Sequence, residues 1–84
     1  MLHALKTIPN YFKSLENEDK NFEIRKFDRP FRVGDEIVLQ EWTKETQYTG
    51  KEIRRKVSYV FQNEPSMGLK PGFCILGLKT FDAE

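Results

Sequence analysis

The segment KNFEIRK at residues 20–26, followed by DRPFRVGD at residues 28–35, decides how this chain folds. Charged and apolar residues alternate in the first segment, so a β-strand there places its two apolar residues on one face and Glu23 and Arg25 on the other. The second segment has turn chemistry, because Pro restricts one backbone dihedral and Gly permits positive φ. We therefore predict a strand over residues 22–27 that ends in a turn.

Four further segments have strand patterns, at residues 1–6, 36–43, 53–62 and 73–81. Residues 36–43 begin as a nearly continuous apolar run, which indicates a strand covered on both faces. Residues 53–62 alternate, which indicates a half-exposed strand. Its outer face is basic, with Arg54 and Lys56, whereas Arg55 shares the inner face with Ile53, Val57, Tyr59 and Phe61.

One short helix is predicted over residues 9–17. Pro9 suits the first turn of a helix, and Thr7 is available as its cap. Tyr11, Phe12 and Leu15 have the spacing of one helical face and are expected to cover the core. Residues 44–51 form a predicted polar loop, and residues 63–72, which contain two Pro and two Gly, are predicted to be irregular.

These elements predict one domain over residues 1–84, mostly β (α+β), with five strands closed or nearly closed into a barrel and one N-terminal helix. Eighty-four residues with 38% hydrophobic content are enough for one core. The 14 basic and 13 acidic residues give a net charge of +1, so basic charge must gather on one face if nucleic acid is the partner. The chain is expected to be a cytoplasmic monomer or weak dimer with no membrane-spanning segment.

Several chemistries have no support in the sequence. It contains no P-loop, dinucleotide fingerprint, nucleophile elbow or zinc-ligand spacing, so we predict no cofactor and no metal. His3 is interpreted as a strand residue rather than a ligand, and the single cysteine, Cys74, as a small buried hydrophobic residue.

Lys20, Glu23 and Arg25 remain as candidate site residues, with two interpretations. They can form exposed ion pairs, each contributing ~0–1 kcal/mol, on a solvated face. Alternatively they line a ligand pocket, in which the two basic groups engage phosphate or a base edge and Glu23 orients them or accepts from an exocyclic amine. Trp42, Tyr48 and Tyr59 lie near polar positions where bases can stack, although Tyr59 shares its face with core residues.

The segment Lys20-x-x-Glu23-x-Arg25, between a helix and the turn at residues 33–35, resembles the signature of ASCH domains in the PUA-like superfamily. The chain is most similar to a small group of bacterial and phage proteins within that superfamily. Further segments carry the resemblance: His3-x-Leu5-Lys6, Phe12, Phe22–Lys26, Asp28-Arg29-x-Phe31-x-Val33-Gly34-Asp35, Leu39-x-Glu41-Trp42 and Tyr48-Thr49-Gly50. The signature usually has Gly two positions before its Lys, where this chain has Glu18.

The resemblance implies a PUA-like pseudo-barrel with a cleft beside the first helix that binds RNA or modified nucleotides. The matching cleft residues are Lys20, Glu23 and Arg25. Their expected neighbours are Lys6, Arg29, Trp42, Tyr48 and Thr49, and Arg54, Arg55 and Lys56 are expected to contact phosphates.

Two other functions remain open. Some ASCH proteins resemble amidohydrolases that deacylate a modified cytidine with a lysine, a threonine and a glutamate. Lys20 matches that lysine, but Glu23 stands where the threonine is expected, so the nucleophile is missing. The third hypothesis is a phage or mobile-element module that binds a protein partner, which the near-zero net charge permits.

Overall fold

The computed structural model describes residues 1–62 and 64–81. Its elements, in chain order, are β1 (Leu2–Thr7), α1 (Pro9–Glu16), β2 (Phe22–Lys26), β3 (Glu36–Thr43), β4 (Gln47–Gln62), the 3-10 helix η1 (Pro65–Met67) and β5 (Phe73–Lys79). All five strands belong to one sheet in the order β1-β3-β4-β5-β2. Among the strands of the described residues, only β1 and β3 pair in parallel. The predicted mostly-β fold with five strands and one N-terminal helix is confirmed.

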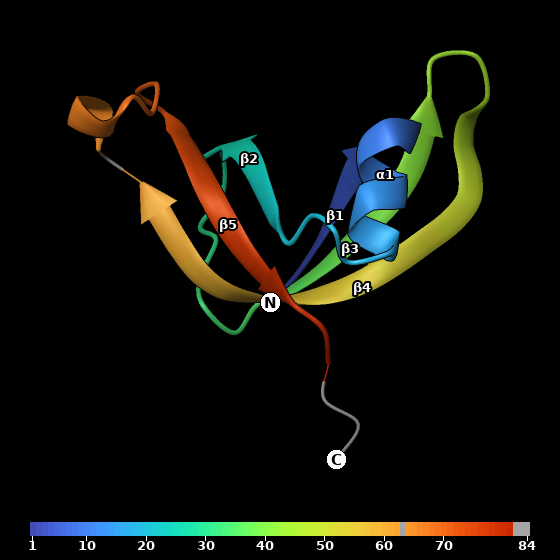
Figure 1. Cartoon of the computed structure of the whole chain (residues 1–84), viewed down its shortest axis with the longest axis horizontal. Helices are drawn as coiled ribbons and strands as arrows, with labels where there is room; N and C mark the ends of the chain where they lie inside the picture. The colour runs from blue at the N-terminus through green and yellow to red at the C-terminus, as the bar shows by residue number, and fades with distance from the viewer. Residues whose placement is uncertain (63, 82–84) are drawn as a thin grey trace.

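The sheet curls into a half-barrel because the long strand β4 bends and belongs to both halves of the sheet. The first half of β4 pairs with β3, and its second half pairs with β5. Figure 1 shows β4 running through the bend, with β2 and β5 on one side and β1, β3 and α1 on the other. A register shift between Val57 and Tyr59 lies within β4, and such bulges increase the local twist and bend a strand.

This bulge makes part of the predicted alternation in β4 wrong. Val57 is fully buried as expected, but Tyr59 is exposed and Val60 packs against the core in its place. The extra residue in the bulge shifts every later side chain to the other face of the strand. A glycine lies opposite this site: a Cβ on Gly77 would come within 2.9 Å of the Ser58 hydroxyl oxygen.

The core fills the inside of the curl. Leu5, Leu15 and Phe31 pack there with the inward residues of the later strands: Ile37, Leu39, Val57, Cys74, Leu76 and Leu78. Cys74 is fully buried, as predicted, and burial raises the pKa of its thiol. Residues 37–39 of β3 are all buried, so the prediction of a strand covered on both faces is confirmed there.

Helix α1 covers one end of this core and ends one residue before the predicted limit. Phe12 and Leu15 are buried, but Tyr11 is exposed, contrary to the prediction. The N-cap residue is Ile8, and no side chain caps the helix. Thr7 instead points inward from β1, and its buried hydroxyl has no hydrogen-bond partner among the described residues. In the described part of the chain, no helix has the length and apolarity needed to cross a lipid bilayer.

Two loop predictions require correction. Residues 44–51 were expected to form a polar loop, but β4 already begins at Gln47, and Trp42 pairs with Tyr48 across a tight β3–β4 hairpin. A register shift lies between Gln40 and Trp42, and beyond it Trp42 and Thr43 still pair with Tyr48 and Gln47. Within the segment 63–72, a short 3-10 helix forms where irregular backbone was predicted, and Asn63 lies outside the described residues.

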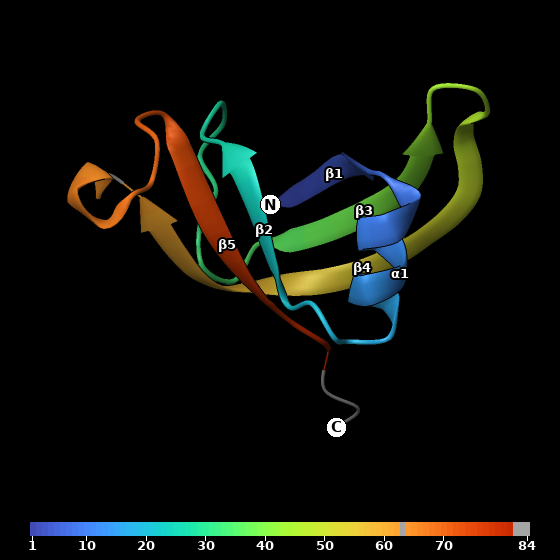
Figure 2. The ribbon, with the colours of Figure 1, turned by 45° about the horizontal axis from the view of Figure 1, so that its top comes forward.

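Strands β1 and β2 form the two edges of the sheet, and the curl brings these edges to face each other (Figure 2). No strand pairing joins them within the described residues. The guanidinium of Arg25 in β2 donates a hydrogen bond to the backbone carbonyl of Lys6 in β1. A side chain therefore spans this open seam where a closed barrel would have a ladder.

His3 lies in β1, as predicted, and belongs to a buried polar cluster beside Phe31. Its Nε2 lies 2.8 Å from Oδ2 of Asp35, which also accepts a hydrogen bond from the Arg32 amide. The other carboxylate oxygen, Oδ1, accepts from the N-terminal ammonium. The hydrogen bond from His3 is the strongest influence on the pKa of Asp35. Together these donors outweigh burial and lower that pKa from 3.8 to about 2.

Candidate functional site

Strand β2 places its charged face inward. Glu23 is only 5% exposed, whereas Phe22 and Ile24 on the opposite face are 40% and 55% exposed. This is the reverse of the usual arrangement, in which a half-buried strand turns its apolar face to the core. A buried carboxylate is costly unless it is paired and hydrogen-bonded, so its surroundings decide whether the arrangement is stable.

Both oxygens of Glu23 accept hydrogen bonds from basic side chains. The Lys20 ammonium lies 2.9 Å from Oε2, and the Arg25 Nε lies 3.2 Å from Oε1. Lys20 also donates to the backbone carbonyl of Phe22 at 2.8 Å, while Arg25 reaches the carbonyl of Lys6 across the seam. The predicted residues Lys20, Glu23 and Arg25 thus form one partly buried ion triad with a formal charge of +1.

Aromatic rings surround the Lys20 end of the triad. The Lys20 Nζ lies 4.7 Å from the ring centre of Phe22 and 5.1 Å from that of Tyr11 on α1. Such contacts place the ammonium over the negative face of each ring. With both rings about half exposed, this end of the triad offers apolar surface next to charged and hydrogen-bonding groups.

Three hollows that share lining residues lie along β2 and the segment that joins it to α1, and we call them together the α1–β2 groove. The hollow at the rings, about 310 Å³, shares Tyr11, Glu23 and Ile24 with a second of about 280 Å³ at the seam. It shares Lys20 with a third of about 250 Å³ at the end of α1. A volume of about 300 Å³ is at the lower end of the range for small-molecule sites.

Basic side chains predominate along this groove. Six line it, Lys6, Lys20, Arg25, Lys26, Arg55 and Lys79, against two acidic ones, Glu18 and Glu23. The whole chain, by comparison, has a net charge of only +1. The basic charge of the protein is therefore concentrated where the hollows are.

Lys6 connects the groove to a second aromatic group. Its Nζ lies 4.8 Å from the ring centre of Trp42 and 5.9 Å from that of Tyr48. Trp42 and Tyr48 do not line any of the three hollows. The predicted neighbour Thr49 also lies outside them and donates to Glu41. These three residues were expected as neighbours of the cleft residues; they lie on the β3–β4 hairpin, where Trp42 and Tyr48 contact Lys6.

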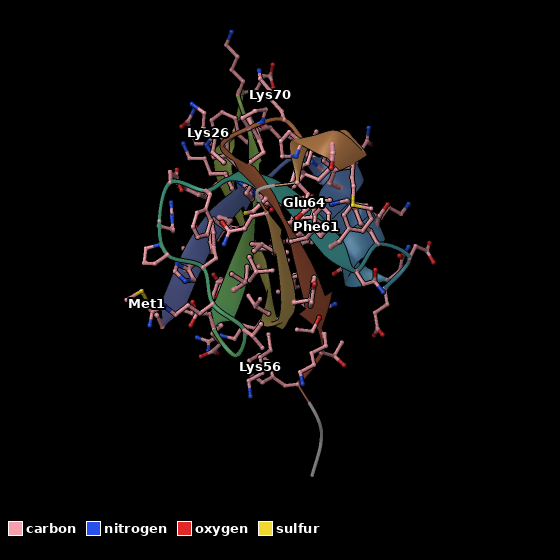
Figure 3. All side chains as sticks on the ribbon, turned by 90° about the vertical axis from the view of Figure 1, so that its left-hand side faces the viewer. Met1, Lys26, Lys56, Phe61, Glu64 and Lys70 are labelled. Atoms are coloured by element: carbon pink, nitrogen blue, oxygen red, sulfur yellow. The ribbon has the colours of Figure 1, made fainter. Side chains whose placement is uncertain are left out.

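The remaining predicted residues divide between structural contacts and other surfaces. Arg29 pairs with Asp28 in the turn after β2, and Arg54 pairs with Glu36. Arg55 lines the third hollow. Its guanidinium has a structural role as well, because it donates a hydrogen bond to the Leu15 carbonyl near the C-terminal end of α1. Figure 3 shows Lys56 at the opposite end of the molecule from Lys26, which lines the groove.

Sequence reasoning missed several residues that line the groove. Tyr11 and Phe22 were expected on apolar faces, and Lys26 and Lys79 were not among the expected site residues. The charge of Lys26 and Lys79 is visible in the sequence, but their places at the two ends of the groove depend on the pairing of β2 with β5, in which Lys26 lies opposite Phe73 and Phe22 opposite Gly77. Among the described residues, no group of three or more His, Cys, Asp or Glu side chains is arranged to hold a metal ion.

The residue that departs from the ASCH-like pattern has an unusual backbone conformation. Glu18 has a φ of 68°, in the left-handed region that favours glycine. It lies in the turn that carries the chain from α1 to Lys20, and its side chain lines the third hollow. The position at which the resembling signature has Gly is thus one where the fold requires a positive φ.

The family model described as a domain of unknown function, DUF3850, matches residues 2–78. The chain belongs to this family. The match includes β1, α1 and β2, which border the groove. The chain is also similar to the "uncharacterized 12.9 kDa protein in GpA 3′ region" of Escherichia phage P2, at 30% identity over 59 residues. That alignment covers 70% of this chain and 53% of the phage protein, so the chain spans about half the length of this relative.

Proposed function

We propose that the α1–β2 groove binds RNA or a nucleotide, and that the protein acts as a binding module. The observation that carries the proposal is the concentration of charge: six basic side chains face two acidic ones in the groove of a protein with net charge +1. Phosphate groups supply the negative charge that such a surface attracts, and clustered Lys and Arg are the usual electrostatic footprint of nucleic-acid binding.

The groove offers separate surfaces to a base and to phosphates. The half-exposed rings of Tyr11 and Phe22 provide stacking surface at the 310 Å³ hollow, and stacking on an aromatic ring contributes ~1–3 kcal/mol per base. The two ends of the groove are basic, with Lys26 in the second hollow and Lys79 in the third. An RNA strand that runs out of the 310 Å³ hollow in either direction would place its phosphates near one of these lysines. The resemblance of the ion triad to the ASCH signature supports the same function.

The amidohydrolase alternative is less well supported by the geometry. A general base must present a free lone pair to its substrate. The amine of Lys20 instead donates to the Glu23 carboxylate and to the Phe22 carbonyl. Glu23 is engaged in turn by two cations, and no threonine stands in its place. Binding therefore accounts for these contacts better than catalysis does.

The test is the affinity for a fluorescein-labelled single-stranded RNA of mixed sequence, measured by fluorescence polarisation over a range of salt concentrations. We expect tight binding at low ionic strength. The logarithm of the association constant should fall linearly with the logarithm of the salt concentration. Replacing Lys79 by Met should reduce the magnitude of the logarithmic salt slope by about 1. Lys44→Met is the matched control, because Lys44 lies in the β3–β4 turn and does not line the groove.

Undetectable RNA and nucleotide binding at the lowest salt concentration would refute the proposal. It would also fail if Lys44→Met and Lys79→Met weakened binding equally, because the contact would then be diffuse. Binding of a protein partner that persists after nuclease treatment, without RNA affinity, would favour the interaction-module hypothesis.

A further inference from the structure

One edge of β2 is free, and the ladder pattern identifies which backbone groups it presents. In the β2–β5 pairing, Phe22 lies opposite Gly77 and Lys26 opposite Phe73, with no register shift between them. At either end, the Asn21 carbonyl and the Phe27 amide form hydrogen bonds toward β5. Antiparallel ladders alternate residue by residue. The backbone groups of the even-numbered residues, 22, 24 and 26, therefore point away from β5 and toward the seam.

Ile24 lies in the middle of this free edge. The Phe22 carbonyl before it is taken by Lys20, and Arg25 after it spans the seam to β1. The N–H and C=O of Ile24 make no such contact among the described residues, and Ile24 lines both of the larger hollows. One donor and one acceptor thus stand side by side on a rigid strand next to the aromatic rings.

The carboxylate of Glu23 adds a second acceptor beside this pair. Glu23 lines the same two hollows as Ile24. Each of its oxygens accepts one hydrogen bond, from Lys20 or Arg25, whereas a carboxylate has about four acceptor positions. The two cations hold the carboxylate in place and leave it with unused acceptor capacity.

We infer that the groove selects bases that carry an exocyclic amine and discriminates against uracil. This inference rests on the proposed nucleotide-binding function. The Ile24 edge pairs with one donor and one acceptor of the base, and the Glu23 carboxylate accepts an additional amine hydrogen. Cytosine, adenine and guanine each have an amine that can supply it, and carboxylates are known to accept from the cytosine amine.

Uracil has a single N–H on its pairing edge, between two carbonyl oxygens. When that N–H bonds the Ile24 carbonyl, a uracil oxygen faces the Glu23 carboxylate, and neither group has a hydrogen to share. An unpaired buried acceptor costs ~1–3 kcal/mol. Cytosine and uracil have nearly the same shape, so this difference tests the hydrogen bonding with little change in packing.

The experiment is a titration of the full chain with CMP and, separately, with UMP. Isothermal titration calorimetry measures the two affinities, and the chemical shifts of the backbone amides show which residues the nucleotide contacts. We expect CMP to bind about tenfold or more tightly than UMP. In Glu23→Gln the ratio should fall to near one, because a glutamine amide can donate to the uracil oxygen as well as accept. The Ile24 amide should shift on CMP binding, whereas the amide of Ile75, its partner across the ladder, should not.

A backbone variant gives an independent readout. Proline is tolerated on edge strands where the N–H faces solvent, so Ile24→Pro removes the free N–H without removing a β2–β5 hydrogen bond. It should weaken CMP binding, and Ile24→Val, which keeps the N–H, should not. If Ile24→Pro fails to fold, the wild-type ratio and amide shifts decide. Equal affinities for CMP and UMP, or an unmoved Ile24 amide, would overturn this inference alone. Absence of binding to either nucleotide would overturn the proposed function as well.

Discussion

Replacing Glu18 by Gly should stabilise the protein. Glu18 has a φ of 68° and sits in the turn after α1, where its amide donates to the Leu15 carbonyl. Its side chain forms no hydrogen bond or ion pair with another described side chain. Little is therefore lost when the side chain is removed, and the strain of a left-handed backbone with a Cβ is relieved.

The magnitude follows from two opposing contributions. A left-handed conformation costs a residue with a Cβ ~1–2 kcal/mol, whereas glycine loses more backbone entropy on folding, ~0.5–1 kcal/mol. The difference is a gain of about 0.5–1 kcal/mol in the free energy of unfolding. For a domain of 60–100 residues this raises the midpoint of thermal unfolding by about 2–8 °C.

Thermal unfolding followed by circular dichroism measures this gain, and Glu18→Gln is the matched control. Gln removes the same negative charge but keeps the Cβ, so its midpoint should stay near that of the natural protein. Both variants should bind RNA more tightly, and to a similar extent, because Glu18 lines the groove. If Glu18→Gly is no more stable than Glu18→Gln, the strain argument is refuted.

Other perturbations give distinct outcomes. The pKa of Asp35 is lowered from 3.8 to about 2 in the folded protein. Its ionised form therefore contributes about 2 kcal/mol to the free energy of unfolding above pH 4, and this contribution is lost as the pH falls toward 2. In Asp35→Asn, the free energy measured by urea unfolding should not show this fall. In Arg25→Lys, a single ammonium cannot reach both Glu23 and the Lys6 carbonyl, so the free energy of unfolding should fall by ~1 kcal/mol and amide hydrogen exchange along β1 should become faster. Unchanged exchange along β1 would show that the seam contact is unimportant. Phe12→Ala empties a fully buried position and should cost ~3–5 kcal/mol in chemical denaturation; a loss below 1 kcal/mol would contradict its place in the core.

The sequence allowed the elements to be predicted well, because hydrophobic period and turn residues act locally. The strand at residues 22–27 was recognised from its alternation alone. The sequence does not indicate which face of this strand points inward, because two apolar side chains on one face compete with two charged ones on the other. The buried Glu23 carboxylate is stable because Lys20 and Arg25 donate to it, and Arg25 is itself held by the Lys6 carbonyl of β1. The bulge near Ser58 likewise depends on the pairing with β5.

The candidate site was predicted in part. Lys20, Glu23 and Arg25 were identified because they are close in sequence as well as in space. Trp42 and Tyr48 were expected beside them from the resemblance; in the structure both rings contact Lys6 and line none of the three hollows. Whether these residues contact nucleic acid stays a prediction, as do the ASCH resemblance and cytoplasmic location.

The pairing scheme also determines when the groove can form during folding. The β3–β4 hairpin joins neighbouring segments, whereas β2 pairs with β5 across most of the chain, Phe22 with Gly77. Closing large loops is entropically costly, so non-local pairings slow folding. We therefore expect the β3–β4 hairpin to be an early folding nucleus and β2 to dock late. A partly folded chain would then have a formed hairpin but no binding groove, so a ligand of the groove would bind only the completed native state.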